Sequence, residues 1–209
     1  MTTIIDAPPG TGEDRTLAAI IGEAFSHLAV SRHLIPDHGA RAAVLARHLG
    51  QNVELARGIG RLLTDTERRS AAVWLAVPDT GLPDVVGYEQ RRAAACGPHT
   101  GRFTEFEDRM HKNHPLGKHH WYLALMAVHP DQQGQGLGST LLRHQLVMLD
   151  RSGQPAYLEA ADPRSRRLYL RHGFSDHGQP FACGHAGPFL WPMWREPRTG
   201  QPATSAVSA

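Results

Sequence analysis

The segment WYLALMAVHPDQQGQGLGST, residues 121–140, decides the fold class of this chain. Its first eight residues form an apolar run of strand length, and a helical pattern starts near Ser139 and continues to about Arg151. Three glycines, at positions 134, 136 and 138, lie between the two. A glycine-rich turn between a strand and a helix places free backbone N–H groups and the positive end of the helix dipole in one concavity. The segment therefore predicts an anion site where the helix begins.

Two familiar anion-binding loops fit this segment poorly. A Walker loop requires a lysine before its Ser or Thr, whereas here Gly138 is followed by Ser139 and Thr140. A dinucleotide fingerprint requires GxGxxG, and the spacing from Gly134 and Gly136 reaches Ser139 where the third glycine belongs. The turn therefore disfavours nucleoside triphosphates and dinucleotides.

A third pattern, Arg/Gln-x-x-Gly-x-Gly/Ala, is filled in register by Gln133, Gly136 and Gly138. It belongs to the acetyl-coenzyme A loop of the GNAT (Gcn5-related) acetyltransferases. Residues 157–174 are similar to that family's next motif, a strand, a helix containing a tyrosine, and a Gly-Phe pair. On these two motifs the chain resembles the GNAT family firmly over residues 121–174 and loosely over the whole domain. The resemblance implies an N-acetyltransferase that uses acetyl-coenzyme A as its co-substrate and a primary amine as acceptor.

Within that family the chain looks most like the puromycin N-acetyltransferase group. The shared features are Ala24-Phe25, Ser31-Arg32-His33, the strand at Ala72-Val73-Trp74, the Trp121 strand and residues 130–139. They imply a small-molecule acceptor, an antibiotic or a metabolite. Two alternatives stay open: an acetyl-coenzyme A-binding regulatory or catalytically weak protein, and a protein or peptide N-acetyltransferase.

The resemblance also implies which residues hold the co-substrate. The backbone of the strand end is expected to pair with the pantetheine arm and to donate to the thioester oxygen, and the glycine-rich loop is expected to bind the pyrophosphate. Asp162 stands where many relatives have Asn, so its cofactor contact is a departure from the pattern. The expected cofactor-binding residues are Met126, Ala127, Val128, Gln133, Gly134, Gln135, Gly136, Leu137, Gly138, Ser139, Asp162 and Ser165.

Three residues are candidates for proton transfer. Tyr169 occupies the position from which the family's tyrosine protonates the leaving thiolate, and a phenol suits that role. Glu159, on the strand opposite the cofactor strand, is the candidate general base. His120 is the alternative base, because an alternating strand would give it the side-chain parity of Met126 and Val128. Neither motif contains a cysteine, so direct attack in a ternary complex is expected. Phe25, Trp74, Tyr88, Phe189 and Trp191 are candidates for the acceptor pocket.

The rest of the chain predicts an α/β (α+β) domain with one mixed sheet flanked by helices, and the resemblance adds a splayed, cofactor-binding strand pair. Residues 1–14 and 197–209 are expected to be flexible on either side of a domain at 15–196. The expected helices are 16–32, about 37–63 with a break near Gly58 and Gly60, a short one around Phe103, and 165–172 ended by Gly173. The expected strands are 70–77 and 84–90, which would form a hairpin, 156–160, and one or more within 181–194.

Composition argues against several other classes of protein. The net charge of +2 is small and the Lys and Arg residues are scattered, so no nucleic-acid partner is expected. No run approaches the ~20 apolar residues of a membrane helix, and no secretory signal is visible, so we expect a cytoplasmic monomer or homodimer. Cys96 and Cys183 lack metal or disulfide spacing. The His-rich stretch 111–120 allows a zinc site, but its spacing favours a solvated polar loop, and no metal is expected.

Overall fold

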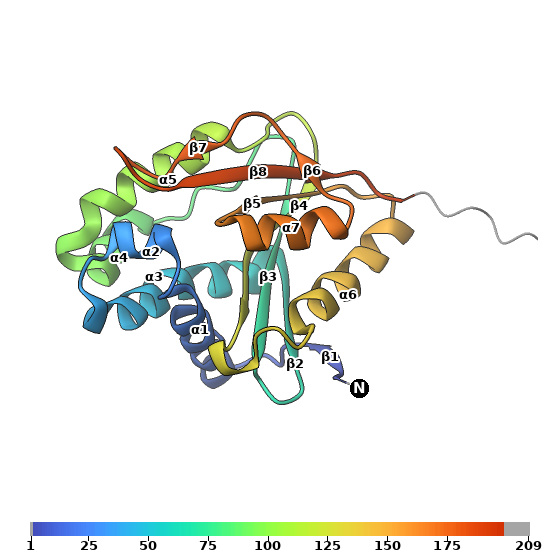
Figure 1. Cartoon of the computed structure of the whole chain (residues 1–209), viewed down its shortest axis with the longest axis horizontal. Helices are drawn as coiled ribbons and strands as arrows, with labels where there is room; N and C mark the ends of the chain where they lie inside the picture. Colours follow the sequence, from blue (N-terminus) through green and yellow to red (C-terminus); the bar gives the residue numbers. More distant parts are fainter. Residues whose placement is uncertain (1, 199–209) are drawn as a thin grey trace, which may run out of the picture.

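A mixed β-sheet with helices on both faces makes up the computed structural model of the chain, which describes residues 2–198 (Figure 1). The sheet order is β1-β2-β3-β4-β5-β8-β6, with β7 paired to β8, and only the β4–β5 pair is parallel. The strands are β1 Ile4–Asp6, β2 Gly60–Asp65, β3 Ser70–Val77, β4 His120–Val128, β5 Ala156–Ala160, β6 Ser175–Asp176, β7 Phe181–Ala182 and β8 Phe189–Arg195. The helices are α1 Thr11–Phe25, α2 Ala29–Leu34, α3 His38–Ile59, α4 Tyr88–Cys96, α5 Thr100–Asn113, α6 Leu137–Arg151 and α7 Pro163–Arg171, with 3₁₀ turns at Gly97–His99 and Pro130–Gln132.

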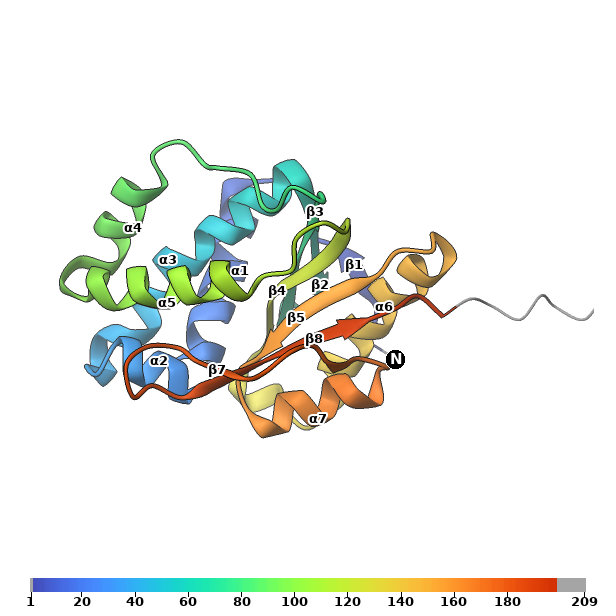
Figure 2. The same ribbon diagram turned by 90° about the horizontal axis from the view of Figure 1, so that it is seen from above.

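The two faces of the sheet carry separate apolar clusters. Helices α1 and α3 cover the face that includes Val73, Leu75 and Tyr157, whereas α6 and α7 cover the face that includes Trp74 and Leu158 (Figure 2). Neighbouring strand residues contribute to opposite clusters, as the two-residue period of a strand requires. The predicted mixed sheet flanked by helices is therefore confirmed, and so are the strands β3, β4 and β5 and the helices α6 and α7.

The predicted break near Gly58 and Gly60 is confirmed, but the long second helix does not continue to residue 63: it ends at Ile59, and the chain turns at Gly60 into β2. Gly60 lies so close to β3 that a Cβ atom there would be 1.9 Å from the Trp74 carbonyl oxygen, so only glycine fits. The partner of β3 is therefore β2, and the predicted hairpin of 70–77 with 84–90 is wrong. Residues 84–90 have no face to bury, since the Val86 side chain is 96% exposed, and Tyr88 instead begins α4 after the left-handed Gly87.

The predicted helix 16–32 is divided in two. Helix α1 starts at Thr11 and ends at Phe25, and the chain becomes extended at Leu28 before α2 begins at Ala29. This break leaves Phe25 and Leu28 at the end of the helix that faces β4, where both residues line cavities described below.

The terminal segments differ from the expectation of flexibility where they are described. Residues Ile4–Asp6 pair with β2, and the Asp14 carboxylate receives a hydrogen bond of 2.6 Å from Arg57. The apolar Ile4 packs on the sheet, which the composition of the segment concealed. At the other end the Arg198 N–H donates to Asp150 Oδ1 at 2.8 Å. Residues 199–209 lie outside the described residues.

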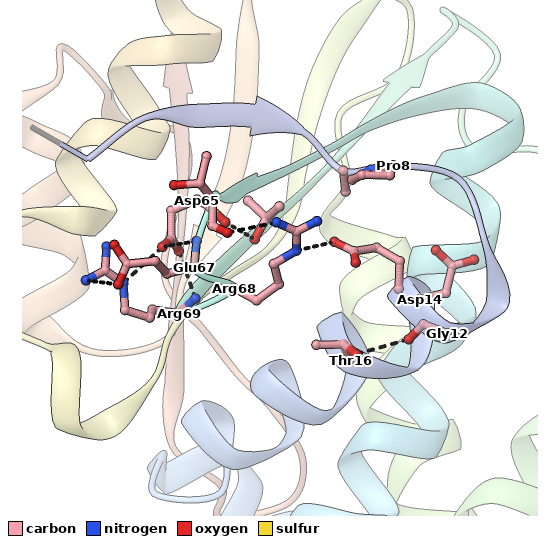
Figure 3. A network of polar contacts seen from close by, with 12 residues as sticks. Pro8, Gly12, Asp14, Thr16, Asp65, Glu67, Arg68 and Arg69 are labelled. Carbon is pink, nitrogen blue, oxygen red and sulfur yellow. Dashed lines mark hydrogen bonds and ion pairs between the residues drawn. The ribbon is translucent and has the colours of Figure 1, made fainter.

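A buried carboxylate fixes the turn between β2 and β3 (Figure 3). Asp65 is fully buried and accepts hydrogen bonds from the Ser70 hydroxyl at 2.6 Å, the Arg69 backbone N–H at 2.9 Å and the Arg69 Nε at 3.0 Å. Burial alone would raise the pKa of Asp65, but these hydrogen bonds outweigh it and lower that pKa. The neighbouring Arg68 Nε donates to Glu13 of α1 at 3.0 Å, so the turn also holds the first helix.

Helices α1 and α3 approach closely at Gly22, where a Cβ atom would lie 2.5 Å from the Ala42 carbonyl oxygen and 2.8 Å from Ala46 Cβ. The contact is backbone against backbone, so a side chain can be admitted only by moving the helices apart. Because α1 ends at Phe25, this close approach also sets the position of the residues that reach β4.

We predict that Gly22→Ala lowers the free energy of unfolding by roughly 1–3 kcal/mol, the usual cost of overpacking a core. Gly58→Ala in α3 is the matched control, because nothing lies within 4 Å of a Cβ placed there and alanine has the better helix propensity. Chemical denaturation of both variants measures the difference. Equal stability of the two would contradict the close helix packing.

Candidate functional site

The site begins where β4 and β5 separate. Their parallel pairing covers only Trp121 with Ala156 and Tyr122 with Tyr157, although β4 continues to Val128 and β5 to Ala160. Immediately after the last pair, the register of β4 against β3 shifts, because Leu123 faces Trp74 while Leu125 faces Val73. Ala124 is therefore the extra residue of a β-bulge, which bends a strand and increases its twist. The bulge and the lost pairing together leave the edge of β4 that would face β5 free.

A cavity of about 390 Å³ lies in this opening. The end of β4, the glycine-rich loop, the start of α6 and one face of α7 line it. It brings together almost all residues that the sequence predicts for co-substrate binding. Gln135 is the exception: it is exposed and does not line the cavity. The predicted residues that line the cavity are Met126, Ala127, Val128, Gln133, Gly134, Gly136, Leu137, Gly138, Ser139, Asp162 and Ser165.

One end of this cavity is suited to an anion. Gly134 and Gly136 have φ values of 82° and 85°, so the loop follows a left-handed path into α6. Among residues 2–198 no side chain caps the first turn of α6, so its N–H groups are available to bind a ligand. Gln133 holds the loop through Nε2, which donates to the Val128 carbonyl at 3.2 Å. The backbone thus fits the pyrophosphate of a coenzyme A thioester.

Two arginines of α7 line this cavity, and sequence reasoning missed both. Arg164 and Arg171 line the cavity from α7, and Arg164 Nη1 donates to Gln133 Oε1 at 3.4 Å. Their spacing of seven residues, which puts them on one face of a helix, was the available signal. Arg164, beside Gln133, supplies positive charge near the glycine-rich loop, whereas Arg171 lies at the opposite end of α7.

Asp162 and Ser165 have a structural role at the start of α7. Asp162 Oδ1 accepts a hydrogen bond from the Ser165 N–H at 2.7 Å, and the Ser165 hydroxyl lies 3.3 Å from the Asp162 N–H, which forms a capping box. An Asn at position 162 would accept the same bond, so either residue can cap α7.

The other end of α7 positions Tyr169. The Gly173 N–H donates to the Leu170 carbonyl at 3.1 Å and the Phe174 N–H donates to the Tyr169 carbonyl at 3.2 Å, which is the hydrogen-bond pattern of a Schellman motif. The predicted helix end at Gly173 is confirmed, with φ of 90°. The Phe174 ring packs edge-on against the Tyr169 ring at 5.9 Å. Tyr169 thus lines the cavity from a fixed position, and burial followed by the Asp162 charge raises its pKa, which keeps the phenol protonated.

A second cavity, of about 410 Å³, lies on the other side of the opening between α2, α3, α4, α5 and β4. It is largely apolar, with Leu45, Phe103 and Phe106 among its walls. The two cavities share five lining residues, which mark the place where they meet: Phe25, Leu28, Ala124, Glu159 and Ala161. Of these five, Glu159 is the one with an ionisable side chain.

The carboxyl of Glu159 is almost fully enclosed, with 3% of its side chain exposed, and Oε1 accepts no hydrogen bond from residues 2–198. Burial raises the pKa of Glu159 to about 7, and the Tyr122 and Tyr157 hydroxyls partly oppose that rise. Glu159 therefore exchanges a proton near neutrality at the junction of the two cavities.

His120 lies elsewhere than the sequence predicts. It is fully buried and lines neither cavity. The parity argument for it is wrong, because the bulge at Ala124 shifts the alternation: Tyr122 belongs to the cluster of Leu125 and Ala127, while Met126 packs on the opposite cluster. A single inserted residue reverses every later side chain of a strand.

His114 was missed by sequence reasoning, which placed it in a solvated loop. It follows α5 and lines the second cavity, its Nδ1 lies 4.0 Å from Glu159 Oε1, and its Nε2 lies 3.1 Å from His120 Nε2. The segment 111–120 therefore turns two histidines inward. Within residues 2–198 no group of three or more His, Cys, Asp or Glu side chains is arranged to hold a metal ion.

Of the five aromatic candidates for an acceptor pocket, two line the cavities and three do not. Phe25 lines both cavities and Tyr88 lines the second from α4. Trp74 is fully buried in the sheet, Trp191 packs on the cluster under α6 and α7, and Phe189 is 54% exposed.

Comparison with known proteins agrees with this geometry. The model of the family described as "Acetyltransferase (GNAT) family" matches residues 67–174, more than half of the chain. The chain belongs to the GNAT acetyltransferase family. It is accordingly an N-acetyltransferase whose acetyl donor is acetyl-coenzyme A. The matched residues contain the splayed strands, the loop and Tyr169.

Solved structures share the fold of this GNAT protein at low identity. One described as "histone acetyltransferase HPA2 and related acetyltransferase" from Corynebacterium glutamicum is 24% identical, with 97% of this chain and 98% of that chain covered and a TM-score of 0.67. Arylalkylamine N-acetyltransferase 2 from Aedes aegypti is 11% identical, with 93% of this chain and 98% of that chain covered and a TM-score of 0.61. The ribosomal-protein-S18-alanine N-acetyltransferase from Escherichia coli is 18% identical, with 97% of this chain and 98% of that chain covered and a TM-score of 0.51.

Helices long and apolar enough to cross a membrane are absent from residues 2–198.

Two glycines at opposite ends of α6 test the anion site. Gly136 and Gly153 both have positive φ, 85° and 65°, and a Cβ atom on either would meet open space. We predict that alanine at each position costs about 1–2 kcal/mol of stability through backbone strain. Only Gly136→Ala should also weaken acetyl-coenzyme A binding, by roughly tenfold or more, the loss expected for one hydrogen bond to a charged group. Calorimetric titration measures both variants, and equal affinities would place the anion elsewhere.

Proposed function

We propose that this enzyme transfers the acetyl group of acetyl-coenzyme A to the primary amine of a small molecule, by direct attack in a ternary complex. The observation that carries the proposal is the enclosed carboxyl of Glu159, with an unbonded oxygen, at the junction of the two cavities. In the proposed arrangement the donor occupies the cavity of the glycine-rich loop and the amine enters from the second cavity. Glu159 is then the acid or base that both substrates meet.

Glu159 acts as the general base in this scheme. An amine must lose its ammonium proton before it can attack, and a carboxylate with a pKa of about 7 accepts that proton near neutral pH. The neutral amine nitrogen then forms a bond to the carbonyl carbon of the thioester and the carbon–sulfur bond breaks. The second proton that the nitrogen loses in becoming an amide replaces the one that Tyr169 gives to the thiolate.

Tyr169 acts as the general acid, giving its phenolic proton to the departing thiolate. Its raised pKa keeps the phenol protonated at neutral pH, so the proton is present when the thiolate leaves, and it also makes the phenol a weaker acid than an ordinary tyrosine. The free backbone edge of β4 at Met126, Ala127 and Val128 is the candidate donor to the carbonyl oxygen as it gains charge. Gln133, Gly134, Gly136, Leu137, Gly138, Ser139, Asp162 and Ser165 complete the proposed donor site.

The second cavity supports a small acceptor. Its volume of about 410 Å³ lies within the usual range of roughly 300–1,000 Å³ for small-molecule sites. Its polar wall is already occupied: Glu107 accepts hydrogen bonds from Arg92 at 2.7 Å and from Tyr88 at 2.7 Å. Asp108 also lines this cavity but is exposed to solvent, so the enclosed carboxyl that an amine meets at the junction is Glu159. An amine carried on an apolar or aromatic group matches these walls, which is consistent with the resemblance to the puromycin N-acetyltransferase group.

A panel of acceptors tests the substrate class. Aminonucleosides, arylalkylamines, polyamines and N-terminal peptides are each supplied with acetyl-coenzyme A, and release of coenzyme A is measured. The proposal expects turnover with one or more compact amines. Turnover restricted to peptides would assign a protein or peptide acetyltransferase, and donor binding without any turnover would assign a regulatory protein.

For Tyr169→Phe we predict a kcat lower by roughly 10²- to 10⁴-fold, because the leaving thiolate loses a positioned acid. The affinity for acetyl-coenzyme A and the melting temperature should change little, since Phe keeps the ring packed against Phe174. Steady-state kinetics and calorimetry on the same sample provide the measurement. A kcat equal to that of the wild type would make Tyr169 a structural residue.

If Glu159 is the base, we predict that kcat/KM rises with pH along a limb with its midpoint near pH 7, because only the carboxylate accepts the ammonium proton. In Glu159→Gln that limb should disappear or move to the titration of the amine itself, and kcat/KM should fall by roughly 10²- to 10⁴-fold. Retention of the limb at pH 7 would remove Glu159 from the role of base.

The same pKa can be measured without activity, from stability. The carboxyl pKa rises from an ordinary 4.5 to about 7 on folding, so its contribution is complete below pH 4.5 and is lost as the pH rises to 7. Relative to Glu159→Gln, the wild type should therefore lose about 3 kcal/mol of unfolding free energy between pH 4 and pH 8. Denaturation curves at several pH values check the size and the sign.

A further inference from the structure

The hydrogen atoms of two buried histidines can be assigned from their partners. His120 Nδ1 lies 2.8 Å from the Lys118 carbonyl, which can only accept, so Nδ1 carries the hydrogen. Burial lowers the pKa of His120, so the ring is neutral and its Nε2 holds a lone pair. His114 Nε2, at 3.1 Å from that lone pair, must then be the donor.

The assignment continues to Glu159. Burial, followed by the nearby His120 and His111, lowers the pKa of His114 to about 3, so this ring is neutral as well. With its hydrogen on Nε2, His114 presents the lone pair of Nδ1 to Glu159 Oε1, 4.0 Å away. Edge-on contacts with Tyr122 at 4.8 Å and Tyr157 at 5.0 Å hold the ring in this orientation. The two lone-pair-bearing atoms therefore face each other across an enclosed gap.

A carboxylate and an imidazole lone pair repel each other, whereas a protonated carboxyl can donate to the lone pair. The remaining groups that face Glu159 are the hydroxyls of Tyr122 and Tyr157, which favour the carboxylate. The other ionisable groups near the histidine pair are His111, which acts on His114, and His119 and His177, which act on His120. Among the groups around the carboxyl, His114 is thus the one arranged to favour its protonated form.

We propose that His114 and His120 are positioning residues for the base: Lys118 and His120 lock the tautomer of His114, which keeps a proton acceptor directed at Glu159 and strengthens Glu159 as a base. The proposal rests on the assignment of Glu159 as the base. The proton that leaves the ammonium is then held on Glu159 Oε1, after an approach of about 1 Å to hydrogen-bond distance from His114 Nδ1. The ring charges do not change in this step.

The tautomers themselves can be read by nuclear magnetic resonance of the wild-type enzyme labelled with ¹⁵N in its histidines. The expected spectrum has the hydrogen of His114 on Nε2 and that of His120 on Nδ1. A hydrogen on His114 Nδ1 would overturn the proposal, whatever the activity of any variant.

The kinetic test uses His120→Leu, which removes the acceptor for His114 Nε2–H. His114 is then free to move its hydrogen to Nδ1 and to donate to the Glu159 carboxylate. We predict that the midpoint of the kcat/KM limb falls by roughly one pH unit, the size expected for one hydrogen bond to a charged group. In a His114→Leu background, the same His120→Leu change should produce no further shift, because His120 acts through His114. His119→Leu, an exposed neighbour, is the control and should leave the midpoint unchanged.

The outcomes separate this proposal from the proposed function. If the limb survives in Glu159→Gln, then Glu159 is not the base, and the positioning role of the two histidines is contradicted as well. A limb that disappears in Glu159→Gln but keeps its midpoint in His120→Leu contradicts the positioning role alone. A shift of equal size with and without His114 would make His120 a structural residue, with no specific action through His114.

Discussion

The site depends on the early end of the hydrogen bonding between β4 and β5. Two parallel pairs hold the strands together at Trp121 and Tyr122, and beyond them the bulge at Ala124 turns β4 away. Backbone groups inside a protein are costly to leave without partners, so a sheet normally closes such a gap. Here β4 and β5 are held apart because each strand is fixed by its partner on the other side. The antiparallel pairing of β4 with β3 and of β5 with β8 is retained, and each strand therefore remains part of the sheet while the space between them becomes available to substrates.

The same principle of unmet bonding recurs at each functional group. Within residues 2–198, the first turn of α6 has no side-chain cap, Glu159 Oε1 has no hydrogen-bond donor, and β4 beyond Tyr122 has no strand paired on the side of β5. Neighbouring elements with complete hydrogen bonding hold these unpaired groups in place. Examples are the capping box and the Schellman motif of α7 and the hydrogen bonds around Asp65. Groups that would bind a ligand or a proton lack hydrogen-bond partners within the described residues. The elements that position these groups have their hydrogen bonds satisfied.

Local features of the site could be predicted from the sequence, and features that depend on distant contacts could not. The glycine-rich turn, the strand before it and the helix end at Gly173 follow from short-range rules of backbone geometry. The bulge at Ala124 carries no local signal, since an apolar run alternates equally well in either register, and it reversed the expected face of His120. His114 joined the site only because α5 returns to β5 in space. Strand β2 was missed because Gly60 is explained by contact with Trp74, not by its neighbours in sequence.

Short strands form the two borders of the sheet: β1 at Ile4–Asp6 lies on one side, and β6 at Ser175–Asp176 lies beside β8 on the other, together with the two-residue β7. Each also carries a charged clasp: Arg61 holds Asp6 of β1 at 2.7 Å, and Arg166 pairs with Asp176 of β6. A long bare border invites another chain to add as a further strand, which is a common route to aggregation. Short, charged borders offer few unpaired backbone groups for such addition. The opened edge of β4, which is the longest unpaired stretch of strand described above, lies in the interior, where helices α1 and α7 shield it from other chains.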